Sequence, residues 1–320
     1  MLKLPRLFAV VCISFWLAPS ARAWGCKGHE AVAILAEAHL TLHARAMAFK
    51  ILAASPIDPA LSRYCKETNL DAFADASTWA DDERTVKPET APWHFIDIPL
   101  GATQNTISTY CPPKTGCVTL ALASQLAILR NPQASPQARA DALRYIIHFV
   151  GDIHQPLHDA TNNDRGGNCV PVTFFGKAPQ ETNTAAESFS PNLHSVWDAD
   201  IVERLANGRT PEQLAIKLNE LLHARQPAWQ SETSTFKTWA WEGHQLAEKI
   251  AYGKLPGKVP LEAPLPSLDS CADDDHVSTR LLQLHEELDA AYQDAAAPVV
   301  EEQLTKAGIR LANLLNTLWP

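Results

Sequence analysis

The stretch that decides the fold reads SPQARADALRYIIHFVGDIHQPLHDA and covers residues 135–160. Ser135 is a good helix cap, and Pro136 suits the first helical turn, where its missing N–H is not needed. Apolar residues then recur at helical spacing until Pro156, which cannot continue a helix and biases the residue before it away from helical geometry. The stretch therefore predicts an amphipathic helix followed by a sharp turn.

The same spacing recurs along most of the chain. Helical patterns cover 30–53, 119–130, 192–207, 210–225, about 233–251, 276–296 and 299–318. A strand signal lies at VPVTFFG (170–176), which we expect in a small hairpin, and the proline-rich stretch 253–270 is expected as a surface loop. Because helical patterns dominate, the sequence predicts an all-α fold in which residues 24–320 form a single, mostly helical domain.

Residues 1–23 have the pattern of a secretory signal peptide. Lys3 and Arg6 precede an apolar run, and Ala21-Arg22-Ala23 is a small-x-small cleavage site. We expect cleavage after Ala23, a secreted or periplasmic protein and, since no second apolar run occurs, no membrane anchor. The leader carries three basic residues, so its loss takes the formal net charge from −9 to −12. A nucleic-acid binder that relies on a basic patch would carry the opposite sign.

Six of the seven cysteines follow the leader, and an even number in an exported protein predicts disulfides. They are Cys26, Cys65, Cys111, Cys117, Cys169 and Cys271. The short loop CPPKTGC makes Cys111 and Cys117 the expected local pair. The pairing of the other four stays open at this point.

Two His-x-x-x-Asp pairs are the first sign of chemistry. In His148/Asp152 and in His194/Asp198 the spacing places both side chains of a pair on one face of a helix. Each pair has a simpler interpretation, as a polar stripe or as an ion pair along one helix. Two such pairs in one chain favour a shared function.

Further positions could join these pairs. The turn after the first helix lets His158 swing back toward Asp152, in competition with His154. Asp81 lies in DASTWADDER and His94 in APWHFIDIP. The alternatives are that Asp81 belongs to a solvated acidic turn and pairs with Arg84, and that the histidine of the second stretch is a buried core residue.

The leader's cleavage site adds one more candidate. Cutting there makes Trp24 the first residue, and a free α-amine with a pKa of about 8 is a nitrogen ligand once deprotonated. Its own carbonyl oxygen can close a chelate ring on the same ion, and His29 lies close enough in sequence to reach it. The alternative is that Trp24 is only the place where the peptidase cuts.

Imidazole nitrogen and carboxylate oxygen together suit zinc. A ligand set without thiolates is typical of catalytic sites that keep positions open for water and substrate. The candidate ligands are Trp24, His29, Asp81, His94, His148, Asp152, His158, His194 and Asp198. They are too many for one tetrahedral site and fit three Zn²⁺ with open positions.

In their order along the chain, the motifs WGCKGH, STWADDER, WHFIDIP, HFVGDIHQPLH, DRGGN and HSVWD resemble the S1/P1 nuclease family, the zinc-dependent single-strand-specific nucleases. They run from residue 24 to residue 198. The resemblance implies a phospholipase C/P1 nuclease-like fold and a monomeric endonuclease. Such an enzyme hydrolyses phosphodiester bonds of single-stranded DNA and RNA to 5′-phosphorylated products, with 3′-nucleotidase activity on mononucleotides as a further expectation.

Residue by residue, the resemblance implies three zinc sites. The first is held by Asp81, His94 and His148. Its neighbour is held by the amine and carbonyl of Trp24 and by His29, with Asp152 bridging the two. The third is held by His158, His194 and Asp198, and His154 is not a ligand. Arg84 would contact the phosphate beside the catalytic Asp81 and Asp152, and the nucleotide pocket would use Asp97, Gly166 and Asn168.

Two other functions stay open on the residues alone. A zinc-dependent phospholipase C would share the fold, the metals and the N-terminal tryptophan, but it places its histidine farther downstream than His29 lies from Trp24. A non-catalytic metal-binding protein would hold closed His/Asp sets, which Arg84 would have no reason to face. The net charge is no objection to a polyanionic substrate, because three bound cations would make the site locally positive.

Overall fold

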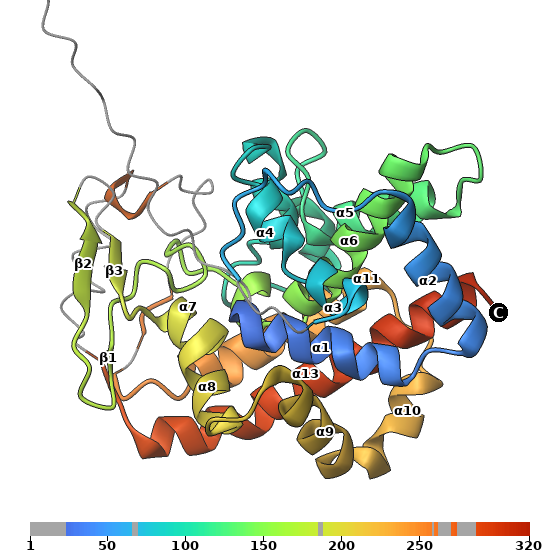
Figure 1. The fold of residues 1–320 in the computed structure, drawn as a ribbon. Helices are drawn as coiled ribbons and strands as arrows, with labels where there is room; N and C mark the ends of the chain where they lie inside the picture. The colour runs from blue at the N-terminus through green and yellow to red at the C-terminus, as the bar shows by residue number, and fades with distance from the viewer. Residues whose placement is uncertain (1–23, 66–69, 185–187, 258, 262–269, 274–285) are drawn as a thin grey trace, which may run out of the picture.

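The computed structural model describes residues 24–320 except 66–69, 185–187, 258, 262–269 and 274–285. The described chain is mostly helical with a few short strands (Figure 1), which confirms the predicted fold class. The predicted leader lies outside the described residues.

The elements follow one another as a series of helices interrupted by short turns. The α-helices are α1 (Gly25–Ala38), α2 (Leu42–Ala54), α3 (Ala72–Ala76), α4 (Trp79–Glu83), α5 (Val118–Arg130), α6 (Pro136–Asp152), α7 (Leu193–Ser195), α8 (Ile201–Ala206), α9 (Pro211–Leu221), α10 (Gln226–Gln230), α11 (Phe236–Leu246) and α13 (Ala290–Leu318). The 3₁₀ and π turns are η1 (Pro88–His94), η2 (Gln104–Tyr110), η3 (Pro156–Asp159), η5 (Val196–Asp200), η6 (His223–Arg225), η7 (Ala247–Tyr252) and η8 (Cys271–Asp273). The strands are β1 (Thr173–Phe174), β2 (Gln180–Asn183), β3 (Ser188–Ser190) and β4 (Glu287–Leu288).

Helix α6 forms as its sequence predicts. The Ser135 hydroxyl accepts a hydrogen bond from the Ala138 N–H at 3.1 Å, and Pro136 occupies the first turn. The helix ends at Asp152, and the chain turns into η3 at Pro156. This turn brings the residues after the helix back toward its last turn.

The predicted helix over 30–53 is wrong in one respect, because the chain breaks between α1 and α2. The Thr41 hydroxyl accepts from the Ala44 N–H and caps α2. Helix α13 stabilises the break, since the amide of its Asn316 donates to the His39 carbonyl at 3.0 Å. Apolar spacing continues across the break, which is marked instead by the Thr41 cap and by the contact with α13.

Of the strand predicted over 170–176 only Thr173–Phe174 forms a strand, and the predicted hairpin is wrong. Strand β1 pairs in parallel with β4, far along the chain, while the small hairpin consists of β2 and β3. The helix predicted over 276–296 is also wrong at β4, and its residues 276–285 lie outside the described part. Helix α13 starts at Ala290 and continues through Pro298, so the two C-terminal patterns merge into one helix.

Long helices bury the core and carry the N-terminal segment inward. Helix α1 packs along α13 and against α9, and α6 packs against α5 and α2 (Figure 1). Disulfides join Cys111 to Cys117, as predicted, and also Cys26 to Cys65 and Cys169 to Cys271. Among the described residues, no helix is both long and apolar enough to cross a membrane.

Candidate metal centre

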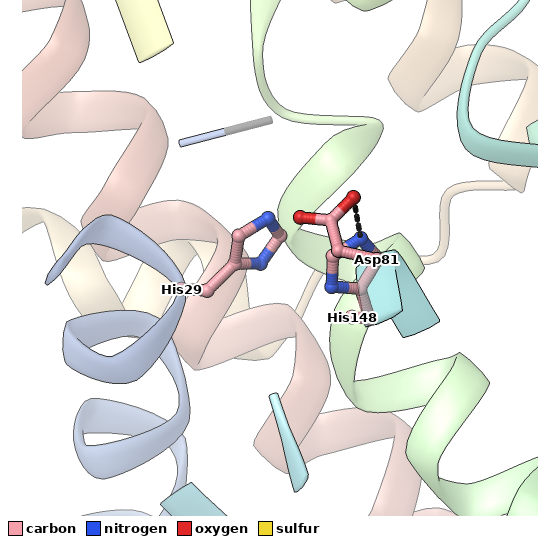
Figure 2. Close-up of side chains that lie close together, drawn as sticks. All are labelled: His29, Asp81 and His148. Carbon is pink, nitrogen blue, oxygen red and sulfur yellow. Dashed lines mark ion pairs between the residues drawn. The ribbon is translucent and has the colours of Figure 1, made fainter. Parts of the chain in front are cut away.

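Histidines and aspartates from distant parts of the chain meet beside α6. Figure 2 shows His29 of α1, Asp81 of α4 and His148 of α6 converging on one another. The ligand atoms of these three lie within 4.8 Å of one another, and the same holds for His94, His148 and Asp152. We call these five residues the paired cluster. Each of them is buried.

Asp152 stands at the middle of the paired cluster, with its two oxygens facing different partners. Oδ1 lies 3.3 Å from His29 Nε2. Oδ2 lies 2.9 Å from His94 Nδ1 and 3.2 Å from His148 Nε2. A carboxylate oriented in this way can bridge two cations, one on each oxygen.

The hydrogen bonds of His148 define which of its nitrogens is a ligand. Its Nδ1 donates to the Ser77 carbonyl at 2.6 Å, so the neutral ring carries its lone pair on Nε2. That lone pair points into the cluster, 3.1 Å from His94 Nδ1. A backbone partner that orients an imidazole in this manner is typical of metal-binding histidines.

A second group, which we call the third cluster, consists of His158 on η3, His194 on α7 and Asp198 on η5. His158 Nδ1 donates to the His94 carbonyl at 2.8 Å, and His194 Nδ1 donates to the Gly166 carbonyl at 2.7 Å. Both rings therefore carry lone pairs on Nε2, and these two atoms face each other at 3.2 Å. Two facing lone pairs need a cation or a proton between them.

Buried polar atoms left without hydrogen bonds test whether metal ions fit here. Within the described part of the chain, His29 Nε2, Asp152 Oδ1 and Asp198 Oδ2 make none. Burying such atoms unpaired is costly, and coordination to a cation removes that cost. The residues present therefore fit divalent metal ions, and the His/Asp set without thiolates is one that binds zinc.

The electrostatics of the two clusters also favour cations. Burial raises the pKa of the Asp198 carboxyl well above its usual range, although a hydrogen bond from Gln155 acts to lower this pKa. Burial alone would also raise the pKa of Asp152, but with the facing histidines protonated the charge of His148 and hydrogen bonds from the surrounding rings hold this pKa well below its usual range. A bound cation would stabilise both groups as carboxylates.

Trp24 lies against the paired cluster at the start of α1. Its ring is buried, and its indole N–H donates to the Gly151 carbonyl at 2.8 Å, one residue before Asp152. Its own carbonyl accepts the Gly28 N–H at 3.0 Å. The indole ring thus anchors Trp24 to the backbone next to Asp152, and the part of this residue as a metal ligand stays a prediction.

Arg84 lies beside the clusters rather than at the surface. Its side chain is 10% exposed, and Nη2 lies 3.1 Å from Asp81 Oδ1. Burial is the main cause of the lowered pKa of His94 and His194, and the positive charge of Arg84 adds to the effect. A single guanidinium thus acts on both clusters. The alternative interpretation of Asp81 as part of a solvated acidic turn is wrong, because Asp81 is buried, although its pairing with Arg84 is present.

The three residues of the predicted nucleotide pocket occupy different environments. Gly166 has a φ of 61°, and a Cβ there would lie 2.4 Å from the Leu157 carbonyl oxygen, so only glycine lets its own carbonyl orient His194. The Asn168 amide donates to the Arg165 carbonyl at 2.7 Å. Burial and the charge of Asp164 raise the pKa of Tyr252, and the charge of Asp97 contributes less. The roles of all three in binding a base stay predictions.

His154 points away from the clusters. Its Nδ1 donates to the Val150 carbonyl at 2.7 Å, and its Nε2 accepts from Arg310 Nη1 at 2.8 Å. Both nitrogens are thus engaged, in line with the choice of His158 over His154. Ser77, Gly151 and Gln155 were not predicted as site residues, yet they orient His148, Trp24 and Asp198 through backbone carbonyls or an amide. All three stand inside recognised motifs, Ser77 in STWADDER and both Gly151 and Gln155 in HFVGDIHQPLH.

A mostly helical fold around buried His/Asp clusters defines a class of proteins with a metal-binding centre. Within that class, the model of the S1/P1 Nuclease family matches residues 24–320, so the chain belongs to the S1/P1 nuclease family and is a nuclease. It is 27% identical to Nuclease S1 of Aspergillus oryzae, over 98% of each chain. It is also 27% identical to Nuclease P1 of Penicillium citrinum, over 92% of this chain and 97% of that one. Endonuclease 2 of Arabidopsis thaliana matches at 27%, over 97% and 96%.

Proposed function

We propose that this nuclease holds three zinc ions and hydrolyses phosphodiester bonds of single-stranded DNA and RNA, leaving 5′-phosphorylated products. The observation that carries the proposal is the pair of imidazole lone pairs, His158 Nε2 and His194 Nε2, which face each other at 3.2 Å. The two oxygens of Asp152, which face His29 on one side and His94 on the other, support two further ions in the paired cluster.

Each ion would have its own ligands. Asp81, His94 and His148 would hold one, His29 and the backbone of Trp24 its neighbour, and Asp152 would bridge them. His158, His194 and Asp198 would hold the third. Bound zinc supplies Lewis-acid chemistry, since it polarises a phosphoryl oxygen and makes water a nucleophile near neutral pH.

The chain's own residues bind and orient the phosphodiester. Arg84 provides a fixed positive charge for the phosphoryl oxygens as negative charge gathers on them. The carboxylate of Asp81, 3.1 Å away, holds this guanidinium in place. Because a guanidinium forms paired hydrogen bonds to phosphate oxygens, Arg84 suits this position better than a lysine would.

Base recognition would fall to Asp97, Gly166 and Asn168. Asp97 can accept from a base N–H, and the amide of Asn168 can serve as donor and acceptor. A base must leave its stack to reach such a pocket, and unstacking costs a few kcal/mol in a duplex, which explains a preference for single strands. The same pocket would accept mononucleotides and so permit 3′-nucleotidase activity. We expect the enzyme to act as a monomer.

Processing would complete the site. We propose that residues 1–23 direct secretion and are removed after Ala23, so that the amine of Trp24 becomes available. Three disulfides agree with an oxidising compartment. Keeping one extra residue before Trp24 should then abolish most of the activity while leaving the fold intact.

The test combines metal analysis with substrate choice. Zinc content by mass spectrometry should give about three equivalents, and single-stranded DNA and RNA should be cut faster than a duplex of the same sequence. End-labelling should place the phosphate on the 5′ side of each product. Metal-free protein with full activity would refute the zinc proposal. Hydrolysis of phosphatidylcholine at a rate like that of DNA would instead favour a phospholipase, and bound metal with neither substrate cut would favour a storage protein.

A further inference from the structure

A disulfide fastens the first turn of α1 next to the paired cluster. Cys26 lies between Trp24 and His29, and it is bonded to Cys65. Cys65 belongs to the loop after α2, where Arg63 and Tyr64 precede it. We call residues 63–65, together with the bond to Cys26, the brace.

The other end of the brace grips the segment 75–82. Arg63 Nε donates to Asp82 Oδ2 at 2.7 Å, and its Nη2 donates to the Thr78 hydroxyl at 2.9 Å and to the Asp75 carbonyl at 3.1 Å. The Tyr64 N–H donates to the other oxygen of Asp82 at 2.9 Å. Several donors therefore fix one short loop against one short segment.

The segment that the brace grips bears directly on the paired cluster. Its Ser77 carbonyl accepts from His148 Nδ1 and so sets the orientation of that ring. Its Asp81 carboxylate contributes a ligand oxygen. On the opposite side, the disulfide holds the turn of α1 that carries His29, whose Nε2 faces Asp152.

We propose that the brace positions the ligands of the paired cluster, and that this chain depends on it to keep the two ions of that cluster. The inference rests on the proposed function, because it requires that metal binds there. It assigns a positioning role to Arg63 and to the Cys26–Cys65 bond, neither of which offers a ligand atom. His29 and Asp81 come from separate helices, and the brace connects their supports through covalent and hydrogen bonds.

The third cluster is supported by bonds that lie outside the brace. His158 is oriented by the His94 carbonyl, His194 by the Gly166 carbonyl and Asp198 by the Gln155 amide. None of these bonds involves the brace or the segment it grips. Loss of the brace should therefore release metal from the paired cluster and leave the third ion in place.

The experiment measures zinc retained after dialysis of the mature protein against a fixed concentration of chelator. The variants are Cys26→Ser/Cys65→Ser and, with the disulfide intact, Arg63→Gln. The matched control is Cys111→Ser/Cys117→Ser, which removes a different disulfide. Wild type and control should keep about three equivalents of zinc, and both brace variants about one. Loss of such supporting contacts typically lowers metal affinity about 10- to 100-fold.

A further variant identifies the ion that stays. Adding Asp198→Asn to the Cys26→Ser/Cys65→Ser protein should remove the last equivalent, because it disables the third cluster. Retention of three equivalents in both brace variants would overturn the inference, and so would loss of all three in the Arg63→Gln protein while its far-ultraviolet circular dichroism is unchanged. A wild-type protein that binds no zinc would instead overturn the proposed function.

Discussion

Because His29 lies close to Gly151 of α6, we expect a side chain at position 151 to destabilise the protein. A Cβ built on Gly151 would lie 2.8 Å from His29 Nδ1 and 2.9 Å from its Cε1, where ordinary contacts begin at 3.4 Å. The ring would have to move by about 0.6 Å, and it is already stacked on His148 with centroids 4.0 Å apart. Overpacking of this kind costs about 1–3 kcal/mol.

The perturbation is Gly151→Ala, made in wild type and in a His29→Ala background. In wild type the steric cost should exceed the gain of about 1 kcal/mol that alanine brings over glycine within a helix. In the His29→Ala background the next atom, Trp24 Cδ1, lies at 3.8 Å, so the same change should stabilise the protein. Urea unfolding with chelator present measures both free energies without a contribution from metal.

A double-mutant cycle then isolates the contact, and we expect a coupling of about 1–3 kcal/mol. Equal effects of Gly151→Ala in the two backgrounds would refute the packing argument. In the metal-loaded Gly151→Ala protein the displaced ring should also lower kcat/KM, by less than the roughly 100-fold that a shift of about 1 Å can cause.

Three further predictions follow from charge. Replacing Arg84 by Lys should lower kcat on single-stranded DNA less than Arg84→Ala, which should cost about 10²- to 10³-fold; equal losses would remove the case for paired hydrogen bonds to phosphate. Burial raises the pKa of Asp198 in the folded protein, so without metal its ionisation destabilises the fold at pH values above the pKa that the carboxyl has in the unfolded chain. Metal-free Asp198→Asn should therefore melt at a higher temperature than metal-free wild type at pH 8, but not near pH 4. Burial would raise the pKa of Glu242, but the charges of Arg310 and Lys306 outweigh burial and lower this pKa. The Glu242 carboxylate therefore stabilises the folded protein above its usual pKa, and this stabilisation is lost as the pH falls through the lowered pKa. Acid titration of Glu242→Gln should accordingly show a shallower loss of stability than wild type, and identical curves would contradict the pairing.

Local rules were sufficient for much of the fold. Ser135, Pro136 and Pro156 defined the limits of α6 because caps and prolines act within one helical turn. The CPPKTGC loop likewise indicated its own disulfide, since a short loop leaves its two cysteines close together. The break at His39 and the parallel pairing of β1 with β4 escaped prediction, because both depend on partners far along the chain.

The sequence by itself determined which side chains could serve as ligands, since imidazole and carboxylate groups keep their chemistry wherever they lie. It also placed His148 with Asp152, and His194 with Asp198, through the period of a helix. Only the tertiary structure decided that α1 brings His29 to Asp152, that Ser77 orients His148 and that Cys26 joins Cys65. These contacts cross long stretches of chain, and packing of α1 and α6 against their neighbours, rather than any local pattern, supplies the free energy that closes those distances.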